Sequence, residues 1–474
     1  MDSDRRAILM AGVATAMAGG GGGRAVAEGT QAPPPVAGPL RLDDEARAAA
    51  AEDFGHIVRR MPQGVLLPAS DQEIATMIRW AGNSQRKIAP QGQRHSVYGR
   101  AQVSDGMVID MTQLRAVHEV RDDRVVVGAG ATWSEVLAAT LPRGLTPPVL
   151  TDYLDLSVGG TLTVGGIGGT TSQHGMQSDN VLELDVITGR GQKITCSSLG
   201  NAGLYDAVRA GLGQVGVITR ATLKLVPAPE KVRRYLLTYP DLATLLKDER
   251  LLATANRFEA VQGSILPTPA GWTFKLDAVR CFSGDDPPDD KALLVGLSDD
   301  RSAAKLSTLS YVDYLKRLAA LEQLLRSKGQ WSYPHPWLMT FVGDSRIDSV
   351  ASAELDRLTP ADLGTFGQIV LSAFHRASVT TPLLQLPADS LVYAFNLVRI
   401  PTTDAVAEAD RLVTANRAIY ERVRGAGGTL YPVSALPMSS DDWRRHFGSA
   451  WHQLRDAKQT FDPGHILTPG YEIF

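Results

Sequence analysis

Two loop segments hold the residues whose types and spacing could do chemistry. The first, Pro90–Ser96, reads Pro-Gln-Gly-Gln-Arg-His-Ser and follows a short stretch that predicts a strand. Backbone N–H groups of a glycine-containing loop can cradle a phosphate. The segment lacks the Gly-x-Gly-x-x-Gly spacing and opens no obvious helix, so it does not match the dinucleotide fingerprint. Taken alone, His95 fits a surface loop residue as well as a reactive one.

The second segment, Thr151–Gly169, places Asp152 ahead of a glycine-rich stretch. Glycines let the backbone approach a ligand because no Cβ stands in the way. Val158, Leu162 and Ile167 are interleaved with these glycines, which favours packed chain over a disordered loop. Asp152 lies beside apolar neighbours, so the residues leave two interpretations open, a partly desolvated carboxylate or a turn cap.

Length and composition limit the classes of protein. A chain of 474 residues is too long for one core, so two or more domains are expected. The formal net charge is -3 and no long basic run occurs, which argues against a nucleic-acid partner. Cys196 and Cys281 form no Cys-x-x-Cys pair, and the histidines lack ligand-like spacing. We therefore expect no disulfide framework, no thiol redox motif and no metal site.

The N-terminus has the features of an export signal. Arg5 and Arg6 precede the weakly apolar stretch 7–18, and Ala25-Val26-Ala27 fits a cleavage site. This pattern predicts a twin-arginine-type signal peptide over residues 1–27 and a periplasmic or secreted protein; the alternative is a disordered tail. Residues 28–49, rich in Pro, Ala and Gly, predict a linker. No other apolar run is long enough for a membrane span, so no stable membrane insertion is expected.

Helix and strand signals alternate along the rest of the chain. Ser70–Glu73 and Thr132–Glu135 both predict capping boxes, and Gly144 is expected to end the second helix. Single helices are expected over Tyr311–Leu325 and Ala405–Arg424. Strands are expected over residues 107–111, 124–127, 181–188, 192–197, 214–226, 272–279 and 391–400.

Several of these segments resemble a known family. Gln91–Ser96 with Val108–Met111 resembles the FAD pyrophosphate loop of the vanillyl-alcohol-oxidase-type, or PCMH-type, flavoproteins. Within that superfamily, further stretches resemble the cytokinin dehydrogenases in the family's order, across about residues 50–474. These stretches are Thr151–Leu162, Asn180–Val186, Gly211–Arg220, Pro334–Leu338 and Phe461–Gly470.

The resemblance implies an α+β, two-domain PCMH-type FAD-binding fold. Its FAD domain is discontinuous, covering residues 50–228 and completed by 432–474. Residues 229–431 would form a substrate domain built on an antiparallel sheet.

The resemblance also implies a set of site residues. His95 would carry FAD covalently and Asp152 would be the catalytic residue and contact the substrate. Further substrate contacts would be Gln262, Trp337 and Met339. The cofactor-binding positions would be Pro90, Gly92, Gln93, Arg94, Ser96, Arg100, Ser157, Thr163, Ile167, Ile218, Tyr431, Thr468 and Tyr471.

The implied activity is FAD-dependent oxidation of the C–N bond of an adenine that carries an isoprenoid side chain on nitrogen, or of a related secondary amine. Hydride transfer belongs to the flavin, so the protein orients the substrate and accepts one proton. Oxygen or a quinone would take the electrons, and the oligomeric state is left open. The same machinery could act on an alcohol, a sugar or a biosynthetic intermediate. A flavin-binding protein without turnover would not need Asp152.

Five positions depart from the plant enzymes of this family. Arg94 replaces glycine, Arg100 and Tyr471 replace glutamines, Gln262 replaces a glutamate that meets the purine, and Met339 replaces a polar residue. A carboxylate accepts from two N–H groups, whereas a glutamine side chain has one acceptor oxygen and one donor group. The FAD positions therefore match better than those expected to bind adenine.

Overall fold

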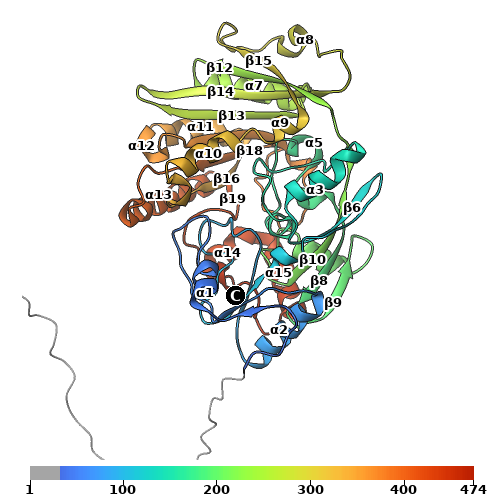
Figure 1. Ribbon diagram of the computed structural model, residues 1–474. Coiled ribbons are helices and arrows are strands. Elements are labelled where there is room, and N and C mark those ends of the chain that lie inside the picture. The colour runs from blue at the N-terminus through green and yellow to red at the C-terminus, as the bar shows by residue number, and fades with distance from the viewer. Residues whose placement is uncertain (1–31) are drawn as a thin grey trace, which may run out of the picture. The chain divides into compact units, whose positions relative to one another are not determined.

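Strands and helices are mixed along the part of the chain that the structure describes, residues 32–474 of a computed structural model. The predicted signal peptide lies outside the described residues. Within them the strands form three larger sheets and one two-stranded ladder, which joins β7 (Leu145–Thr146) to β11 (Val226–Pro227) (Figure 1).

The first sheet presents the loop that contains His95. Its strand order is β1-β2-β4-β3, with β2, β4 and β3 parallel. Parallel strands need a crossover connection, and α2 carries the chain from β2 to β3, on the two sides of β4. The bounds are β1 Leu40–Arg41, β2 Gly64–Leu66, β3 Ile88–Gln91, β4 Met107–Asp110, α1 Asp44–Ala50 and α2 Asp71–Asn83. The linker prediction for residues 28–49 is wrong at its end, because Leu40 pairs with Leu66 and Asp43 caps α1.

The second sheet is antiparallel, in the order β5-β6-β10-β8-β9. Its strands are β5 Val117–Val120, β6 Arg124–Gly128, β8 Val181–Thr188, β9 Lys193–Cys196 and β10 Gly216–Lys224. The helices around it are α3 Trp133–Thr140, α4 Val158–Leu162, α5 Thr171–His174 and α6 Ala202–Val208. The Thr132–Glu135 capping box is confirmed, and Gly144 ends the following 3-10 turn with φ 68°.

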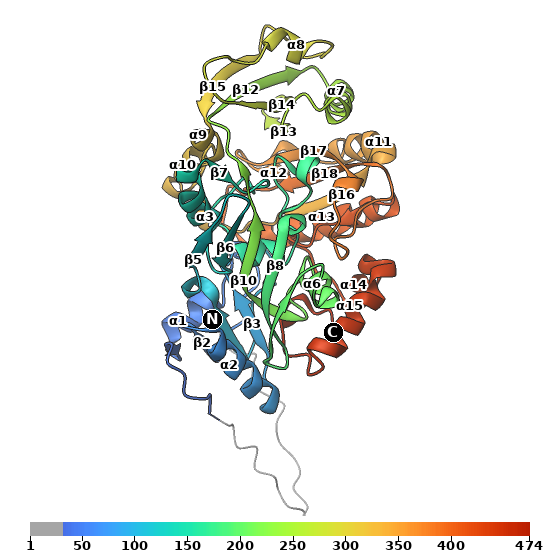
Figure 2. The ribbon, with the colours of Figure 1, turned by 90° about the vertical axis from the view of Figure 1, so that its right-hand side faces the viewer.

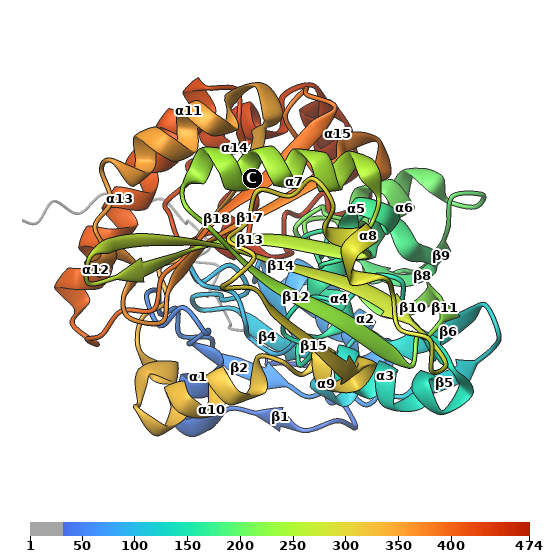
Figure 3. The same cartoon turned by 90° about the horizontal axis from the view of Figure 1, so that it is seen from above.

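The third sheet is antiparallel and has eight strands within the described chain, in the order β15-β12-β14-β13-β17-β18-β16-β19. Its strands are β12 Lys231–Tyr239, β13 Ala260–Thr268, β14 Gly271–Phe282, β15 Lys305–Ser310, β16 Leu338–Gly343, β17 Gln368–His375, β18 Leu391–Val398 and β19 Thr429–Leu430. Its helices are α7 Leu242–Ala255, α8 Asp290–Leu294, α9 Tyr311–Leu315, α10 Ala319–Ser327, α11 Asp344–Leu355, α12 Pro360–Leu363 and α13 Val406–Gly425. Figures 2 and 3 show α7 and α11 on one side of the strands and α9 and α10 on the other.

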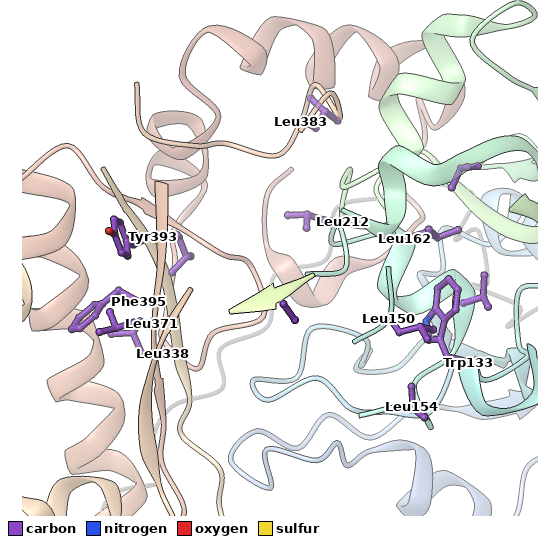
Figure 4. Packing of buried hydrophobic residues seen from close by; sticks show 14 of the residues in the cluster. Trp133, Leu150, Leu154, Leu162, Leu212, Leu338, Leu371, Leu383, Tyr393 and Phe395 are labelled. Carbon is purple, nitrogen blue, oxygen red and sulfur yellow. The ribbon is translucent and has the colours of Figure 1, made fainter. Parts of the chain in front are cut away.

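Side chains of this sheet alternate between two faces, as the strand period of two requires. Tyr393 and Phe395 of β18 and Leu371 of β17 point toward the helices and are fully buried. Figure 4 shows these three on the same side of the strands, away from Trp133 and Leu150. The intervening residues face the other way, which leaves one face of the sheet free to form a wall.

The C-terminal segment returns to the first sheet. Helices α14 (Ser440–Phe447) and α15 (Trp451–Phe461) precede it, and α15 packs on α6. The N–H of Ile88 then donates to the carbonyl of Ile466, and the N–H of Thr468 donates to the carbonyl of Ile88. These two hydrogen bonds attach the C-terminal segment to β3 of the first sheet. The domain limits stay a prediction.

Two predicted helix features differ in the structure. The Ser70 side chain makes no cap bond, because Glu73 instead accepts from the N–H groups of Ala37, Gly38 and Ala69. The helix expected over residues 311–325 is broken into α9 and α10.

Glu249 on α7 is a buried carboxyl on the helix-covered face of the sheet, and it links pH to stability. It is 1% exposed, and neither carboxyl oxygen has a hydrogen-bond partner within residues 32–474. Burial raises the pKa of this carboxyl from 4.5 to about 8. The unfolded chain releases the proton at lower pH than the folded chain, so stability falls as pH rises from about 4.5 to about 8.

We expect Glu249→Gln to remove that dependence, because the amide resembles the protonated carboxyl and cannot ionise. The apparent melting temperature of the variant should exceed that of the wild type at pH 8 and equal it near pH 5. The gain should be about 1–3 kcal/mol at pH 8. Glu45→Gln, at an exposed site on α1, is the control. A gain independent of pH would contradict the explanation.

Candidate active site

One cavity of about 440 Å³ lies where the first two sheets and the free face of the third sheet meet. That volume is in the range of cofactor and small-molecule sites. All the site residues predicted from the sequence line this cavity, although their individual roles stay predictions. They are Pro90, Gly92, Gln93, Arg94, His95, Ser96, Arg100, Asp152, Ser157, Thr163, Ile167, Ile218, Gln262, Trp337, Met339, Tyr431, Thr468 and Tyr471.

The loop after β3 packs too closely against α4 for most side chains. A Cβ on Gly92 would lie 2.0 Å from Oγ of Ser157, so only glycine fits there. Arg94 has φ 54°, a left-handed conformation that favours glycine, the residue expected there from the family. Its Nη1 donates to the carbonyl of Ala49 at 2.6 Å. Gln91 fixes the start of the loop, because its Nε2 donates to the carbonyls of Ala50 and Ala101.

His95 is held by an aromatic stack. Its ring lies 4.0 Å from that of Phe54 at an interplanar angle of 17°. Phe54 also stacks on His335, at 4.1 Å and 22°, and the Phe54 carbonyl lies 3.1 Å from Nδ1 of His335. Burial lowers the pKa of His95 to about 4, so its imidazole is neutral at physiological pH. Its Nε2 is buried and lacks a hydrogen-bond partner in the described part of the chain.

Asp53 ties this loop together from behind. Its carboxylate, 4% exposed, accepts from Oγ of Ser96 at 2.8 Å and from the N–H groups of Gly99 and Gly55 at 2.7 and 3.1 Å. Burial raises the pKa of Asp53 to about 7 even though these donors act in the opposite direction. Asp53 and Phe54 were not predicted from the sequence. Each contacts residues about forty positions away, and no local pattern indicates such contacts.

Asp152 lies on the other part of the cavity wall, in the segment between β7 and α4. Its side chain is 39% exposed and its Oδ1 accepts from Nη2 of Arg317 at 2.5 Å. Of the two interpretations from sequence, the turn cap is wrong, and an ion pair replaces the purely apolar setting. Arg317 was not predicted; the signal was an arginine three residues after Tyr314, on the apolar side of the expected helix.

Arg100 is a buried cation on the cavity wall. Its guanidinium carbon lies 5.2, 5.5 and 5.3 Å from the ring centroids of Tyr98, Trp443 and Tyr471. Burial lowers its pKa, and it forms no ion pair with a carboxylate within residues 32–474. Nη2 donates to the carbonyl of Leu436, while Nε has no partner there. Since an uncompensated buried charge is costly, this site fits an anionic ligand group.

The free face of the third sheet forms the remaining wall. Because alternate residues face the cavity, β13, β16, β17 and β18 contribute only uncharged side chains to it. These are Gln262, Met339, Gln368, Val370, Ser372, Ala394, Asn396 and Val398. Gln262 makes no side-chain hydrogen bond among the described residues, so its amide is available to a ligand. Trp337 also borders the cavity, with its indole N–H on the carbonyl of Arg399.

The remaining predicted positions hold the backbone around the cavity. The hydroxyl of Tyr431 accepts from the N–H of Gly166 at 3.1 Å, and burial raises its pKa to about 12. Thr468 has φ 51°, and its Oγ1 donates to the carbonyl of Gly213. The described residues contain no group of three or more side chains placed to hold a metal ion. Nor do they include a helix long and apolar enough to cross a membrane.

Known protein families match two separate segments of the chain, and several known proteins match most of its length. Residues 62–197 match the FAD binding domain family, and residues 288–474 match the family described as cytokinin dehydrogenase 1, FAD and cytokinin binding. An uncharacterized oxidoreductase of the fasciation locus of Rhodococcoides fascians is 40% identical over 440 residues, 92% of this chain and 99% of that protein. Cytokinin dehydrogenase 7 of Oryza sativa subsp. japonica is 35% identical, covering 93% of this chain and 92% of its own. Cytokinin dehydrogenase 2 of Arabidopsis thaliana is 31% identical, covering 92% and 93%.

Removing the Asp53 carboxylate should loosen the His95 loop. We expect Asp53→Ala to lower the free energy of unfolding by about 2–4 kcal/mol, because three buried donors lose their acceptor. Asp241→Ala, which removes an exposed cap of α7, should cost only about 1 kcal/mol. Denaturant unfolding measures both. Equal losses in the two variants would show that Asp53 has no special part in holding the loop.

Proposed function

The chain belongs to the cytokinin dehydrogenase family and is an FAD-dependent oxidoreductase, and on that basis we propose that it oxidises the C–N bond of an adenine carrying an isoprenoid side chain on nitrogen. The observation that carries this proposal is the pairing of two groups in one cavity. A single carboxylate, Asp152, and a neutral imidazole, His95, both line it. An amine oxidation by hydride transfer requires one proton acceptor at the substrate nitrogen.

The residues present fit FAD. The cofactor, when bound, supplies the hydride acceptor at flavin N5. The close backbone at Gly92, the left-handed turn at Arg94 and the unpaired buried cation of Arg100 suit its diphosphate. We propose that His95 holds the flavin covalently, because its imidazole is neutral and has a buried nitrogen without a protein partner.

The positions of the chain's residues support a role for each of them in the reaction. Asp152 would accept the proton of the substrate N–H while the C–H bond gives up its electron pair as hydride. The resulting imine would then be hydrolysed to an aldehyde and a free amine. Gln262 would meet the heterocycle with one acceptor and one donor group, and Trp337 and Met339 would pack against its apolar parts. The uncharged sheet face supports a neutral substrate.

Two further parts of the proposal rest on the sequence. The reduced flavin would be reoxidised by oxygen or a quinone. Arg5 and Arg6, followed by Ala25-Val26-Ala27, support export by the twin-arginine route.

Anaerobic mixing with isopentenyladenine tests the proposed function. We expect the flavin absorption band to bleach, and Asp152→Asn to bind flavin normally but slow bleaching by about 10²–10⁴-fold, the usual contribution of a general base. Asp155→Asn, which changes the same segment at a carboxylate bonded to Ser134, is the control. Bleaching by alcohols or sugars alone would favour the alternative substrates, and no bleaching by any of them would leave only flavin binding.

Covalent attachment is tested separately. After acid precipitation the yellow colour should stay with the wild-type protein and move to the supernatant for His95→Ala, because the variant lacks the ring nitrogen. His375→Ala, at a histidine that contacts the carbonyl of Ala253 outside the cavity, should behave like the wild type. Release of all flavin from the wild type would refute the covalent bond.

A further inference from the structure

Arg317 occupies the break between α9 and α10. The break is three residues long, Lys316–Leu318, and Leu318 lines the cavity. The Arg317 side chain is 13% exposed. Its guanidinium carbon lies 4.5 Å from the Tyr314 ring centroid, and its Nη1 is 3.4 Å from the Tyr314 carbonyl. These contacts aim Nη2 at Asp152.

The ion pair engages only one oxygen of Asp152. Oδ1 accepts from Arg317 at 2.5 Å, whereas no hydrogen bond to Oδ2 occurs within residues 32–474. The carboxylate is 39% exposed at the cavity while its partner is much more buried. One oxygen is therefore anchored from the protein side and the other is free to meet a ligand.

Two further ion pairs lie around this one. Arg234 of β12 and Asp277 of β14 form their own bidentate pair, with contacts of 3.0 and 2.6 Å. Glu322 and Arg326 of α10 pair with each other next to Tyr153. The surrounding loops and sheet also contribute the neutral imidazole of His95, the basic Arg94 and the acidic Asp155. Tyr314 and the uncharged Gln262 complete the surroundings.

The guanidinium of Arg317 stays charged in this setting. Burial by itself lowers the pKa of Arg317, but the carboxylate of Asp152 and its other neighbours raise it above the ordinary value. Asp152 consequently faces a cation.

We propose that Arg317 is a positioning residue that anchors Oδ1 of Asp152 and turns Oδ2 toward the substrate N–H. The inference rests on the proposed function, in which Asp152 accepts that proton.

The test is the rate of flavin reduction by isopentenyladenine under anaerobic conditions, measured as the limiting rate and as the substrate concentration that gives half of it. In Arg317→Gln the limiting rate should fall about 10- to 100-fold. The half-saturating concentration should change little, because the variant loses the donor that orients Asp152 and keeps the rest of the cavity. Arg317→Lys should restore most of the rate, and Arg317→Gln added to Asp152→Asn should cost little more than Asp152→Asn alone.

A purely structural role would give a different result. Arg422→Gln breaks a comparable ion pair with the buried Glu354, at 2.6 Å, outside the cavity, and should change stability without changing the limiting rate. If Arg317→Gln left the limiting rate unchanged, or if the lysine variant were no better, the inference would be overturned.

A failure of the proposed substrate is distinguishable. If isopentenyladenine does not bleach the wild-type flavin, the proposed function fails. The ion pair is then judged by a double-mutant cycle of Asp152→Asn and Arg317→Gln on the melting temperature. A favourable coupling between the two residues supports the anchoring pair, and a coupling of zero overturns it.

Discussion

The buried carboxylate of Asp53 holds in place the His95 loop, which forms one wall of the cavity. Beyond β3 the chain has no further strand partner, so its donors must find acceptors inside the protein. Asp53 supplies that acceptor for Ser96 and Gly99 and simultaneously binds Gly55. Phe54 lies between these anchored residues, and its stacking on His95 follows from their position. The imidazole of His95 is thus oriented by Asp53 and Phe54, which do not themselves line the cavity.

The opposite wall follows from the period of a β-strand. Residues of β18 such as Tyr393 and Phe395 pack under helices, and the residues between them face the cavity. Because this face contributes only uncharged groups, the charges of the site come from the loops and from the break after α9. The sheet supplies shape and amide groups, and the loops supply the carboxylate of Asp152 and the cations.

The departures from the plant enzymes are grouped in space. Arg100 and Tyr471, which both replace glutamines, contact one another at 5.3 Å. The guanidinium of Arg100 lies there among three aromatic rings, which places a positive charge on the cavity wall. On the substrate side, Gln262 removes a negative charge, and Arg317 balances the remaining one on Asp152. The cavity therefore suits a neutral substrate next to an anionic cofactor.

Sequence alone determined much of this protein. Local signals correctly predicted the capped helix after Thr132, the strand 181–188 and the mixed α+β class. The resemblance of the His95 and Asp152 segments, and of later stretches, to the family identified residues that line the cavity. The capping box predicted at Ser70 was wrong, because Glu73 accepts instead from the N–H of Gly38, thirty-five residues away. No local pattern indicates such a contact.

Only the tertiary structure decided which side chains form contacts across long sequence separations. Asp53 reaches Ser96 across forty-three positions, and Arg317 reaches Asp152 across one hundred and sixty-five. The periodicity of residues 311–325 also did not predict the break between α9 and α10, because the apolar spacing continues through it. Such contacts depend on how sheets and loops pack in three dimensions. A buried charge takes whichever partner that packing brings near it, and the one-dimensional pattern does not contain that distance.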